Sequence, residues 1–454
     1  MKLRNKIVSG AISLILIANS IASIAFAADV NQIPSTEVDS VFNIEVNSNQ
    51  LTDWPEGPNI YSESGIVMDM DSGAILYAKN IDDQHYPASI TKVMTALVAL
   101  ENYQLDETVK FTWDDIGFLE YGDAHIGIKE GEEISMESAL YGMLLASANE
   151  VSHGIGSHME GGYETFLEKM NEKSKELGCK NSHWMNTNGL HDEEHYTSAR
   201  DMALIGAAAF QYEKFREIVS TYQYKIPVTN ITAEERFVHQ NHKMIRDWDS
   251  RYYEYCVGGK TGYTDQALTT LVTFATKEDV NLVAVTLRTH GGGNNAYADT
   301  RAMLDYGFNN FSKVPVTEAM IGNENVSSCE EDAYIMVPAS IDESQLKCVL
   351  TDPVEKGDKT GTVEFFYEKQ SVGKVEVKIT EKHYNEIHGI TTEKKEEKKS
   401  YKGVFLVLKI VLIIIGVIAL LMGTLLGYVY YKRKKLEEKR RRRRMQQRKQ
   451  RELE

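Results

Sequence analysis

The chain has 454 residues, too many for one compact core and enough for two or three domains. Its 42% hydrophobic and 26% charged residues exclude a disordered chain and a multi-span membrane protein, and its 4 cysteines exclude a disulfide-dense scaffold. The formal charge of −16 is unevenly divided, because residues 432–454 carry a net charge of +9 and residues 28–431 a net charge of −28. An acidic body repels nucleic acid, so we expect no nucleic-acid partner.

The first 27 residues have the pattern of a secretory signal. Three basic residues within the first six precede an apolar run, Ile7–Ile17, and Ala25-Phe26-Ala27 forms a small-residue cleavage site. Cleavage there leaves a mature chain that starts at Ala28, and an uncleaved N-terminal anchor is the alternative. We therefore expect the body of the protein outside the cytoplasm.

Near the other end, Ile410–Tyr431 contains 22 residues without a charge. As a helix this run is about 33 Å long, which matches a hydrocarbon core of about 30 Å. We predict a membrane-spanning helix over 403–431. The basic tail at 432–454 is then cytoplasmic by the positive-inside rule.

Two hairpin signals enclose the middle of the chain. Gly65–Met70 and Ala74–Tyr77 flank the turn Asp71-Ser72-Gly73, and Leu268–Thr276 and Asn281–Arg288 flank a second turn. Helical patterns lie between the two hairpins. We predict an α/β (α+β) class in which one antiparallel sheet is closed by the two ends of a domain and a helical lobe is inserted.

Other segments differ in composition. Residues 28–58 are polar and unpatterned, as in a spacer, and the charged stretch 382–402 cannot bury a core. Residues 314–381 show the alternation of an all-β domain.

The first chemical element is Ser89-Ile90-Thr91-Lys92, at the start of an apolar helix. Residues three apart share a helix face, so the Lys92 amine can lie beside the Ser89 hydroxyl and activate it if its pKa is depressed. A helix-capping serine with an exposed lysine is the alternative. The same spacing recurs at Ser344 with Lys347 and at Ser371 with Lys374.

Two further elements follow. Ser147-Ala148-Asn149 offers a hydroxyl and an amide on a loop between helices, where a plain helix cap is the alternative. Gly258-Gly259-Lys260-Thr261-Gly262 offers a charge and a hydroxyl to a carboxylate, beside glycines that let a ligand approach a strand. A glycine-rich turn is the alternative there, and Lys359-Thr360-Gly361 repeats the tripeptide.

In this order the elements form the S-x-x-K, S-x-N and K-T-G series of penicillin-binding proteins and β-lactamases. Residues 61–311 resemble the D-alanyl-D-alanine carboxypeptidases, which are low-molecular-mass penicillin-binding serine peptidases. The motifs that carry the resemblance are Tyr86-Pro-Ala-Ser-Ile-Thr-Lys-Val-Met-Thr-Ala, Leu145-Ala-Ser-Ala-Asn-Glu, Asn188-Gly-Leu, Tyr196-Thr-Ser-Ala-Arg-Asp-Met-Ala, Gly259-Lys-Thr-Gly-Tyr-Thr and Asp305-Tyr-Gly-Phe. The region after Val314 resembles the small C-terminal domain of that family more loosely.

The resemblance implies a penicilloyl-transferase/β-lactamase-like fold and hydrolysis of the terminal D-Ala-D-Ala bond of peptidoglycan stem peptides, with β-lactams as covalent inhibitors and no cofactor. It assigns Ser89 as acyl nucleophile, Lys92 as its base, Ser147 as proton donor to the leaving D-alanine, Asn149 as a contact to the substrate backbone, Lys260 and Thr261 as the carboxylate site, and the N–H groups of Ser89 and Tyr263 as the oxyanion hole beside Gly262. Composition, patterning and the resemblance together divide the chain into these segments: signal peptide 1–27, spacer 28–58, catalytic domain 59–313, β-rich domain 314–381, stalk 382–402, membrane helix 403–431 and basic tail 432–454.

Some features depart from the family or leave alternatives open. Many family members have an arginine where Ala296 lies here, which leaves an auxiliary carboxylate contact in question. A β-lactamase, an endopeptidase or a non-catalytic wall-binding or signalling protein are the alternative functions. His191 and His195 have metal-like spacing but no third ligand, so we predict no metal site. Cys329 and Cys348 are candidates for a disulfide, whereas Cys179 and Cys256 are equally consistent with small buried residues.

Overall fold

The computed structural model describes residues 35–353, 357–390 and 402–451, so the predicted signal peptide lies outside the described residues. The chain divides into two compact units, and the division in the sequence falls between Tyr384 and Asn385. The strands are β1 (Ser62–Asp69), β2 (Ile75–Lys79), β3 (Thr108–Lys110), β4 (Glu133–Ser135), β5 (Gln223–Ile226), β6 (Arg236–His239), β7 (Cys256–Thr264), β8 (Leu268–Lys277), β9 (Val280–Thr289), β10 (Phe311–Pro315), β11 (Val326–Cys329), β12 (Tyr334–Pro338), β13 (Lys347–Thr351), β14 (Thr360–Tyr367) and β15 (Gln370–Ile379). The α-helices are α2 (Ser35–Phe42), α3 (Thr91–Asn102), α4 (Met136–Leu145), α5 (Asn149–Ser157), α6 (Tyr163–Glu176), α7 (Ala199–Phe210), α8 (Glu213–Ser220), α9 (Gly293–Asn310), α10 (Glu318–Ile321), α11 (Glu381–Ile387) and α12 (Lys402–Arg451).

The central sheet confirms the predicted closure of the domain by its two ends. Its strand order is β2-β1-β9-β8-β7, and every neighbouring pair is antiparallel. The first two strands precede the helical lobe in the chain, and the last three follow it. Both predicted hairpins are present, as β1–β2 and β8–β9. The strand with the Gly-Lys-Thr-Gly sequence, β7, therefore lies at an edge of the sheet.

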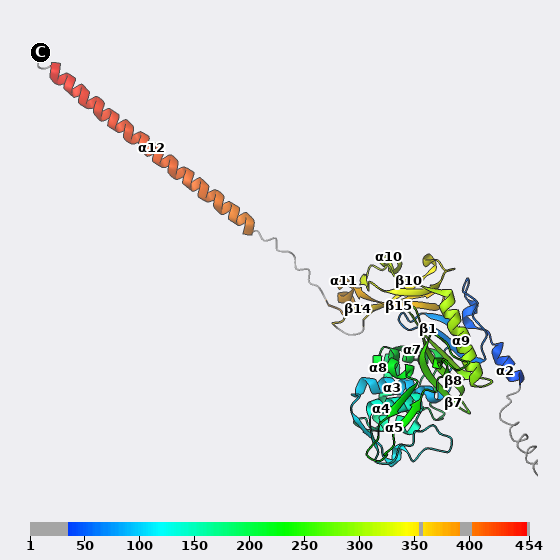
Figure 1. The fold of residues 1–454 in the computed structure, drawn as a ribbon. Coiled ribbons are helices and arrows are strands. Elements are labelled where there is room, and N and C mark those ends of the chain that lie inside the picture. Colours follow the sequence, from blue (N-terminus) through cyan, green and yellow to red (C-terminus); the bar gives the residue numbers. More distant parts are fainter. Residues whose placement is uncertain (1–34, 354–356, 391–401, 452–454) are drawn as a thin grey trace, which may run out of the picture. The chain divides into compact units, whose positions relative to one another are not determined.

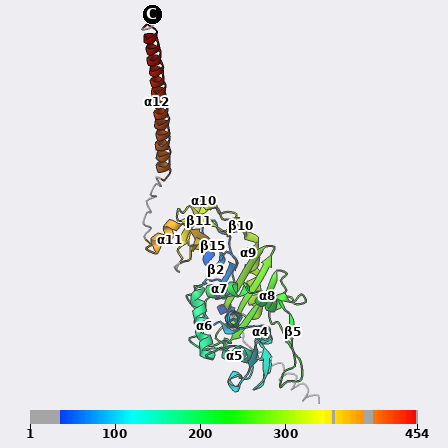
Figure 2. The ribbon, with the colours of Figure 1, turned by 90° about the vertical axis from the view of Figure 1, so that its left-hand side faces the viewer.

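The two faces of the sheet pack against different layers, because successive strand residues point to opposite sides. Ile66 and Met68 of β1 join the core that includes α7 and the helical lobe. Val67, between them, joins a second core that includes α9. Figures 1 and 2 show α4 and α5 at the far end of this unit from β10 and β15. The lobe also contains two short ribbons: β3–β4 lies between α3 and α5 in the chain, and β5–β6 follows α8.

The region at 314–381 is mainly β, as predicted, with the short helix α10 added. Strands β11-β15-β14-β13 form one sheet, and β12 pairs with β10. Alternate residues of β14 are buried, which is the pattern that its sequence predicts. This region contacts the first hairpin, because Gln370 Nε2 donates to Ile75 O at 2.9 Å. The boundary at 313/314 stays a prediction.

The segment before β1 differs from the expected spacer. Residues 35–58 contain α2 and a 3-10 turn, and Val46, Leu51 and Trp54 are buried in the second core. Trp54 Nε1 donates to Leu76 O at 3.3 Å, and the buried Lys79 amine donates to Val41 O at 2.9 Å. The apolar residues of this segment are few and irregularly spaced, so no periodicity in the sequence predicts their burial. They nevertheless cover the edge strand β2.

The expected stalk at 382–402 also begins differently. Residues 381–387 form α11, and Tyr384 is buried, while 391–401 lie outside the described residues. In the second unit, α12 is one helix of 50 residues, about 75 Å long. Its segment Phe405–Lys449 contains a window with a mean hydropathy of 3.1, none of it buried. By length and composition this helix is able to cross a membrane.

Candidate active site

The loop that carries Ser89 is held by contacts on two sides. Ser89 lies in a 3-10 turn, Ala88–Ile90, that leads directly into α3. Ala88 has a φ of 51°, in the left-handed region that a β-carbon disfavours, and its carbonyl accepts a hydrogen bond from Thr91 Oγ1 at 2.8 Å. From the sheet, Thr270 Oγ1 donates to Pro87 O at 2.7 Å. The serine therefore stands at the start of a helix, where free backbone N–H groups favour developing negative charge.

A second segment closes on this loop at Gly189, whose φ is 85°. A β-carbon at that position would lie 1.9 Å from Ala88 O. No L side chain fits in that space, so the Asn188-Gly189 turn requires its glycine. The close approach brings the Asn188 carbonyl to the base of the Ser89 site.

The Lys92 amine lies one helical turn beyond Ser89 and is fully buried. Its Nζ is 3.0 Å from Ser89 Oγ, 2.8 Å from Asn149 Oδ1 and 2.5 Å from Asn188 O. A neutral amine has two N–H donors and one lone pair. When the amide and carbonyl oxygens accept the two donors, the lone pair is left for the serine hydroxyl.

The environment of Lys92 favours this neutral form. Burial holds the pKa of the Lys92 amine well below its usual value, and the nearby charge of Lys260 lowers it further. Glu150 opposes the shift more weakly. Lys92 is therefore able to take a proton from Ser89 near neutral pH, as a general base must.

The second element lies between α4 and α5. Ser147 has a φ of 64°, and its Oγ lies 3.0 Å from Lys260 Nζ. Asn149 is the first residue of α5, and its Oδ1 accepts from Lys92. Among the described residues Asn149 Nδ2 has no partner, so that donor remains available to a substrate carbonyl. The Ser147 hydroxyl thus faces Lys260, and the Asn149 amide faces Lys92.

The third element is the middle of β7. Lys260 is buried, and its Nζ donates to Thr261 O at 2.6 Å as well as facing Ser147. Burial lowers the pKa of the Lys260 amine to about 7. Lys260 therefore gains or loses its charge close to physiological pH. A bound carboxylate would stabilise the charged form.

Gly262 lets the Ser89 loop approach β7. A β-carbon at Gly262 would lie 2.9 Å from Ser89 N and 2.3 Å from Thr270 Oγ1. Next to it Tyr263 is 56% exposed and points its hydroxyl to Asp265 at 3.1 Å. Thr261, Gly262 and Tyr263 join Ser89 and Ser147 in the wall of one cavity of about 420 Å³.

The eight predicted site residues are thus brought together from three distant stretches of the chain. The structure adds wall residues that the sequence did not indicate, namely Asn241, Lys243, Leu271 and Tyr297, and it places Ala296 in the same wall. Lys243 N donates to Tyr297 Oη at 3.1 Å, which ties the segment after β6 to α9. The Asn188 carbonyl was missed as well. Its position in the Asn188-Gly-Leu motif was the only available signal.

The two histidines with metal-like spacing serve separate contacts. His195 is buried, with Nε2 2.8 Å from Thr91 Oγ1 and Nδ1 accepting from Met185 N at 3.0 Å. His191 is exposed and packs edge-on against Tyr86. His195 Nε2 therefore contacts the start of α3, and Nδ1 contacts the segment that contains Met185.

All four cysteines are free thiols in the structure. The candidate pair Cys329 and Cys348 is therefore not joined, and the Cys348 thiol instead lies 3.2 Å from Ile321 O. Burial of the sulfur raises the pKa of the Cys256 thiol to about 12, and the residue as a whole is half-buried.

Comparison with known proteins places this site in a family context. The sequence model described as D-alanyl-D-alanine carboxypeptidase matches residues 51–291, just over half of the chain. The D-alanyl-D-alanine carboxypeptidase DacF of Bacillus subtilis (strain 168) is 28% identical over 326 residues, which are 66% of this chain and 80% of that protein. DacB2 of Mycobacterium tuberculosis is 31% identical over 258 residues, which are 56% of this chain and 84% of that protein.

A solved structure is similar over the same region. The crystal structure of a D-alanyl-D-alanine carboxypeptidase from Mycobacterium tuberculosis H37Rv matches with a TM-score of 0.52 and 29% sequence identity. The match covers 57% of this chain and 95% of that one. The arrangement of sheet and helical lobe is therefore shared.

Proposed function

The chain belongs to the D-alanyl-D-alanine carboxypeptidase family and is a serine-type D-Ala-D-Ala carboxypeptidase, and on that premise we propose that Ser89 is its acyl nucleophile. The observation that carries the proposal is the buried Lys92 amine, 3.0 Å from Ser89 Oγ and with a strongly lowered pKa. The substrate is the D-Ala-D-Ala end of a peptidoglycan stem peptide. β-Lactams react with the same serine.

In the acylation step Lys92 takes the Ser89 proton, and Oγ attacks the carbonyl carbon of the penultimate D-alanine. The oxyanion is stabilised by the N–H groups of Ser89 and Tyr263. The close approach of Ser89 N to Gly262 supports this, because it brings the start of α3 against the edge strand β7.

Breakdown of the intermediate requires a proton on the leaving D-alanine nitrogen. Ser147 passes to that nitrogen the proton that Lys92 took from Ser89, so Lys92 becomes neutral again. The contact of Ser147 Oγ with Lys260 Nζ at 3.0 Å supports the role. The C–N bond breaks, D-alanine leaves, and the shortened peptide remains as an ester on Ser89. Water then attacks the ester, releases the peptide and restores the hydroxyl.

The free carboxylate of the substrate binds beside strand β7. Lys260 and Thr261 supply a charge and a hydroxyl, and Asn149 Nδ2 holds the peptide backbone. Ala296 contributes only a methyl group to this wall, so no arginine assists at that position.

The membrane orientation is part of the proposal. The catalytic part lies outside the cytoplasm, α12 crosses the membrane once, and the basic residues after Tyr431 lie inside. Protease added to intact spheroplasts should remove the catalytic part and spare a fragment that contains 410–454. A catalytic part that resists protease until the membrane is permeabilised would reverse this orientation.

The function is tested with the full-length protein in detergent, incubated with a peptide that ends in D-Ala-D-Ala, with a cross-linked muropeptide and with penicillin. We expect release of D-alanine from the first, little cleavage of the second and a long-lived covalent adduct with the third. Rapid catalytic hydrolysis of penicillin would favour a β-lactamase. Preferred cleavage of the cross-link would favour an endopeptidase. The absence of any reaction would favour a non-catalytic protein.

A further inference from the structure

Four aromatic side chains lie exposed on the ribbon β5–β6 and on the segments beside it. Trp248 is 65% exposed and Phe237 is 54% exposed, and Tyr222 and His239 are exposed as well. The Trp248 and Tyr222 rings meet edge to face with centroids 4.7 Å apart, and the Tyr222 and His239 rings with centroids 5.5 Å apart. Phe237 lies two residues before His239 on β6, so both side chains point to the same side of the ribbon. We call these four residues the ring cluster.

Contacts with neighbouring polar side chains fix the position of the ring cluster. The Arg246 guanidinium lies over the Tyr222 ring, 5.7 Å from its centroid, and donates to Gln240 O. His239 Nε2 lies 3.1 Å from Oε1 of Gln223, its partner across the ribbon. Single exposed aromatic residues are common, but exposed rings that contact one another mark a binding surface.

The ring cluster adjoins the wall of the active-site cavity. Gln240 N donates to Tyr222 O at 2.8 Å, and the next residue, Asn241, lines the cavity. Gln240 Nε2 also donates to Val219 O at 3.0 Å, the same carbonyl that Gly258 approaches in the first turns of contact along β7. The ring cluster therefore lies near the end of β7 where the strand begins.

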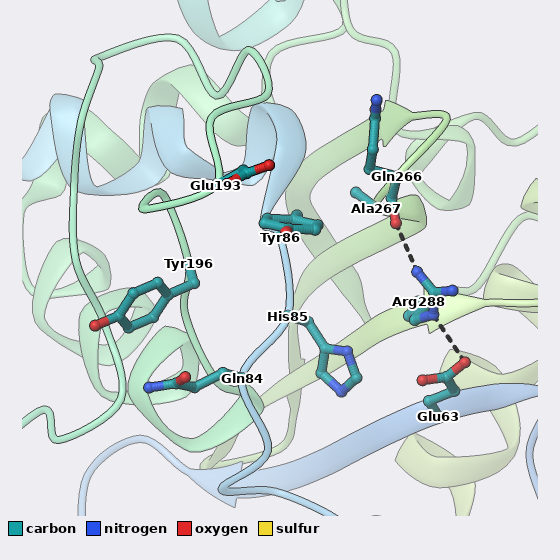
Figure 3. A pocket seen from close by; sticks show the side chains of 9 residues that line it. All are labelled: Glu63, Gln84, His85, Tyr86, Glu193, Tyr196, Gln266, Ala267 and Arg288. Atoms are coloured by element: carbon teal, nitrogen blue, oxygen red, sulfur yellow. Dashed lines mark hydrogen bonds and ion pairs between the residues drawn. The ribbon is translucent and has the colours of Figure 1, made fainter.

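A bound stem peptide leaves the ring cluster uncovered. Lys260, in the proposed carboxylate site, precedes Gly262, which faces Ser89 N. From its carboxylate to its reacting carbonyl, the peptide therefore advances toward the other end of β7, where Gln266 belongs to a different cavity (Figure 3). Because the ring cluster lies beyond the carboxylate, it can bind another part of the wall polymer while the cleft is occupied.

The charges next to Trp248 cancel. Asp249 Oδ1 accepts from Arg251 Nε at 2.6 Å, and Arg246 is followed by the exposed Asp247. A surface of this kind does not favour a strongly charged partner. Four rings are also far fewer than the about 20–30 residues per side that a stable protein–protein interface uses. The ring cluster therefore suits a small, uncharged unit of a larger ligand.

Ring faces beside polar side chains have the chemistry that recognises a sugar. The C–H groups on one face of a sugar ring are attracted to the negative face of an aromatic ring, and its hydroxyl groups reach polar neighbours such as Arg246 and Gln223. We propose that the ring cluster binds the sugar strand of peptidoglycan, a polymer of N-acetylated amino sugars, outside the cleft. The inference goes beyond the proposed function and takes from it only that the substrate peptides are attached to this strand.

The test is calorimetric titration of the full-length protein, in a detergent without a sugar head group, with a β-1,4-linked oligomer of N-acetylglucosamine. We expect the wild-type protein to bind the oligomer, and to bind it equally tightly after acylation by penicillin, since the ring cluster lies outside the cleft. Trp248→Ala should weaken binding at least about fivefold, whereas Trp248→Phe, which keeps a ring, should weaken it less.

Trp113→Ala is the matched control, because Trp113 is 62% exposed but lies against Gly117, outside the ring cluster. This variant should keep the wild-type affinity. Unchanged binding in Trp248→Ala, or equal weakening in Trp113→Ala and Trp248→Ala, would overturn the proposal. Loss of binding after acylation would place the sugar in the cleft and would overturn it too.

Acylation by penicillin is measured separately from sugar binding, so the two claims fail in different ways. A wild-type protein that is acylated but does not bind the oligomer would overturn the sugar site, favour a protein partner for the ring cluster and leave the peptidase function intact. A protein that binds the oligomer but is neither acylated nor releases D-alanine would overturn the proposed function and support the sugar site.

Discussion

The S-x-x-K spacing occurs three times in the chain, and the copy in the cleft differs in its surroundings from the copy on strand β15. In the cleft, Ser89 and Lys92 lie at the start of a helix with the amine buried. In the C-terminal region, Ser371 and Lys374 lie on strand β15, where residues three apart point to opposite faces. The Lys374 side chain is 49% exposed and lies 3.6 Å from Glu364.

The Lys-Thr-Gly tripeptide also occurs twice, and its two copies show the same contrast. Lys260 is buried behind Ser147, whereas Lys359 is exposed at the surface, 3.7 Å from Glu381. Burial is what lowers the pKa of an amine, and Lys260 is buried whereas Lys359 is not. Burial and backbone setting, rather than residue spacing, therefore distinguish a site from a coincidence.

The sharpest contrast is between the two lysines. Removing the general base with Lys92→Ala should lower the rate of acylation by penicillin about 10³-fold, since positioned bases contribute about 10²–10⁴-fold. Lys374→Ala should stay within about twofold of wild type. Stopped-flow measurement of acylation checks both variants, and more than a tenth of the wild-type rate in Lys92→Ala would rule out the assigned base.

Two glycines allow the effect of a steric clash in the cleft to be distinguished from the effect of backbone strain alone. Gly189 and Gly178 have similar φ values, 85° and 79°, but a β-carbon meets Ala88 O only at Gly189. We expect Gly189→Ala to destabilise the protein by about 2–5 kcal/mol and Gly178→Ala by about 1–2 kcal/mol. Thermal unfolding and acylation rates measure this difference. Equal effects would show that the Ala88 contact is unimportant.

The carboxylate site should distinguish an acid from an amide. A charge-assisted contact is typically worth about 1.5–3 kcal/mol, so amidating the terminal D-alanine should lower kcat/KM about 10- to 150-fold. Lys260→Gln should reduce activity on the acid and narrow this preference, while Lys359→Gln leaves it unchanged. Equal use of acid and amide by the wild type would reopen the endopeptidase alternative.

The last contrast is between a buried histidine and an exposed one. Burial lowers the pKa of the His195 imidazole to about 3, so the folded protein stays unprotonated there while the unfolded chain binds a proton below about 6.5. Stability should therefore fall as the pH drops from about 6.5 toward 3, by up to about 1.4 kcal/mol per pH unit from this group. The denaturant midpoint, measured as a function of pH, should fall less steeply in His195→Asn than in the wild type. His191→Asn should have the same slope as the wild type.

Much of the fold was predictable because it depends on periodicity. Runs of β-forming residues on both sides of short turns identified the hairpins β1–β2 and β8–β9, and the spacing of apolar residues identified α3. The packing of Trp54 and Val46 on the sheet was not predictable, because two or three apolar residues in a polar segment set no period. Composition marked the segment as a spacer, but burial of a few side chains suffices to attach it.

The site was predictable as far as its chemistry resides in side chains of a motif. Ser89, Lys92, Ser147 and Lys260 were identified in this way, and the structure brings them together. The Asn188 carbonyl was not identified, because a backbone oxygen has the same chemistry at every residue. Neither was the second contact of Asn149, which holds Lys92 as well as facing the cleft. Such contacts depend on how the chain folds back on itself.

The central claim is that Ser89, and no other serine, carries the acyl group. The most direct test is to treat the full-length protein with penicillin, digest it and locate the adduct by mass spectrometry. The account predicts one modified peptide, containing Ser89, and no modification in Ser89→Ala, while Ser371→Ala labels like wild type. An adduct on any other residue, or labelling of Ser89→Ala, would contradict it.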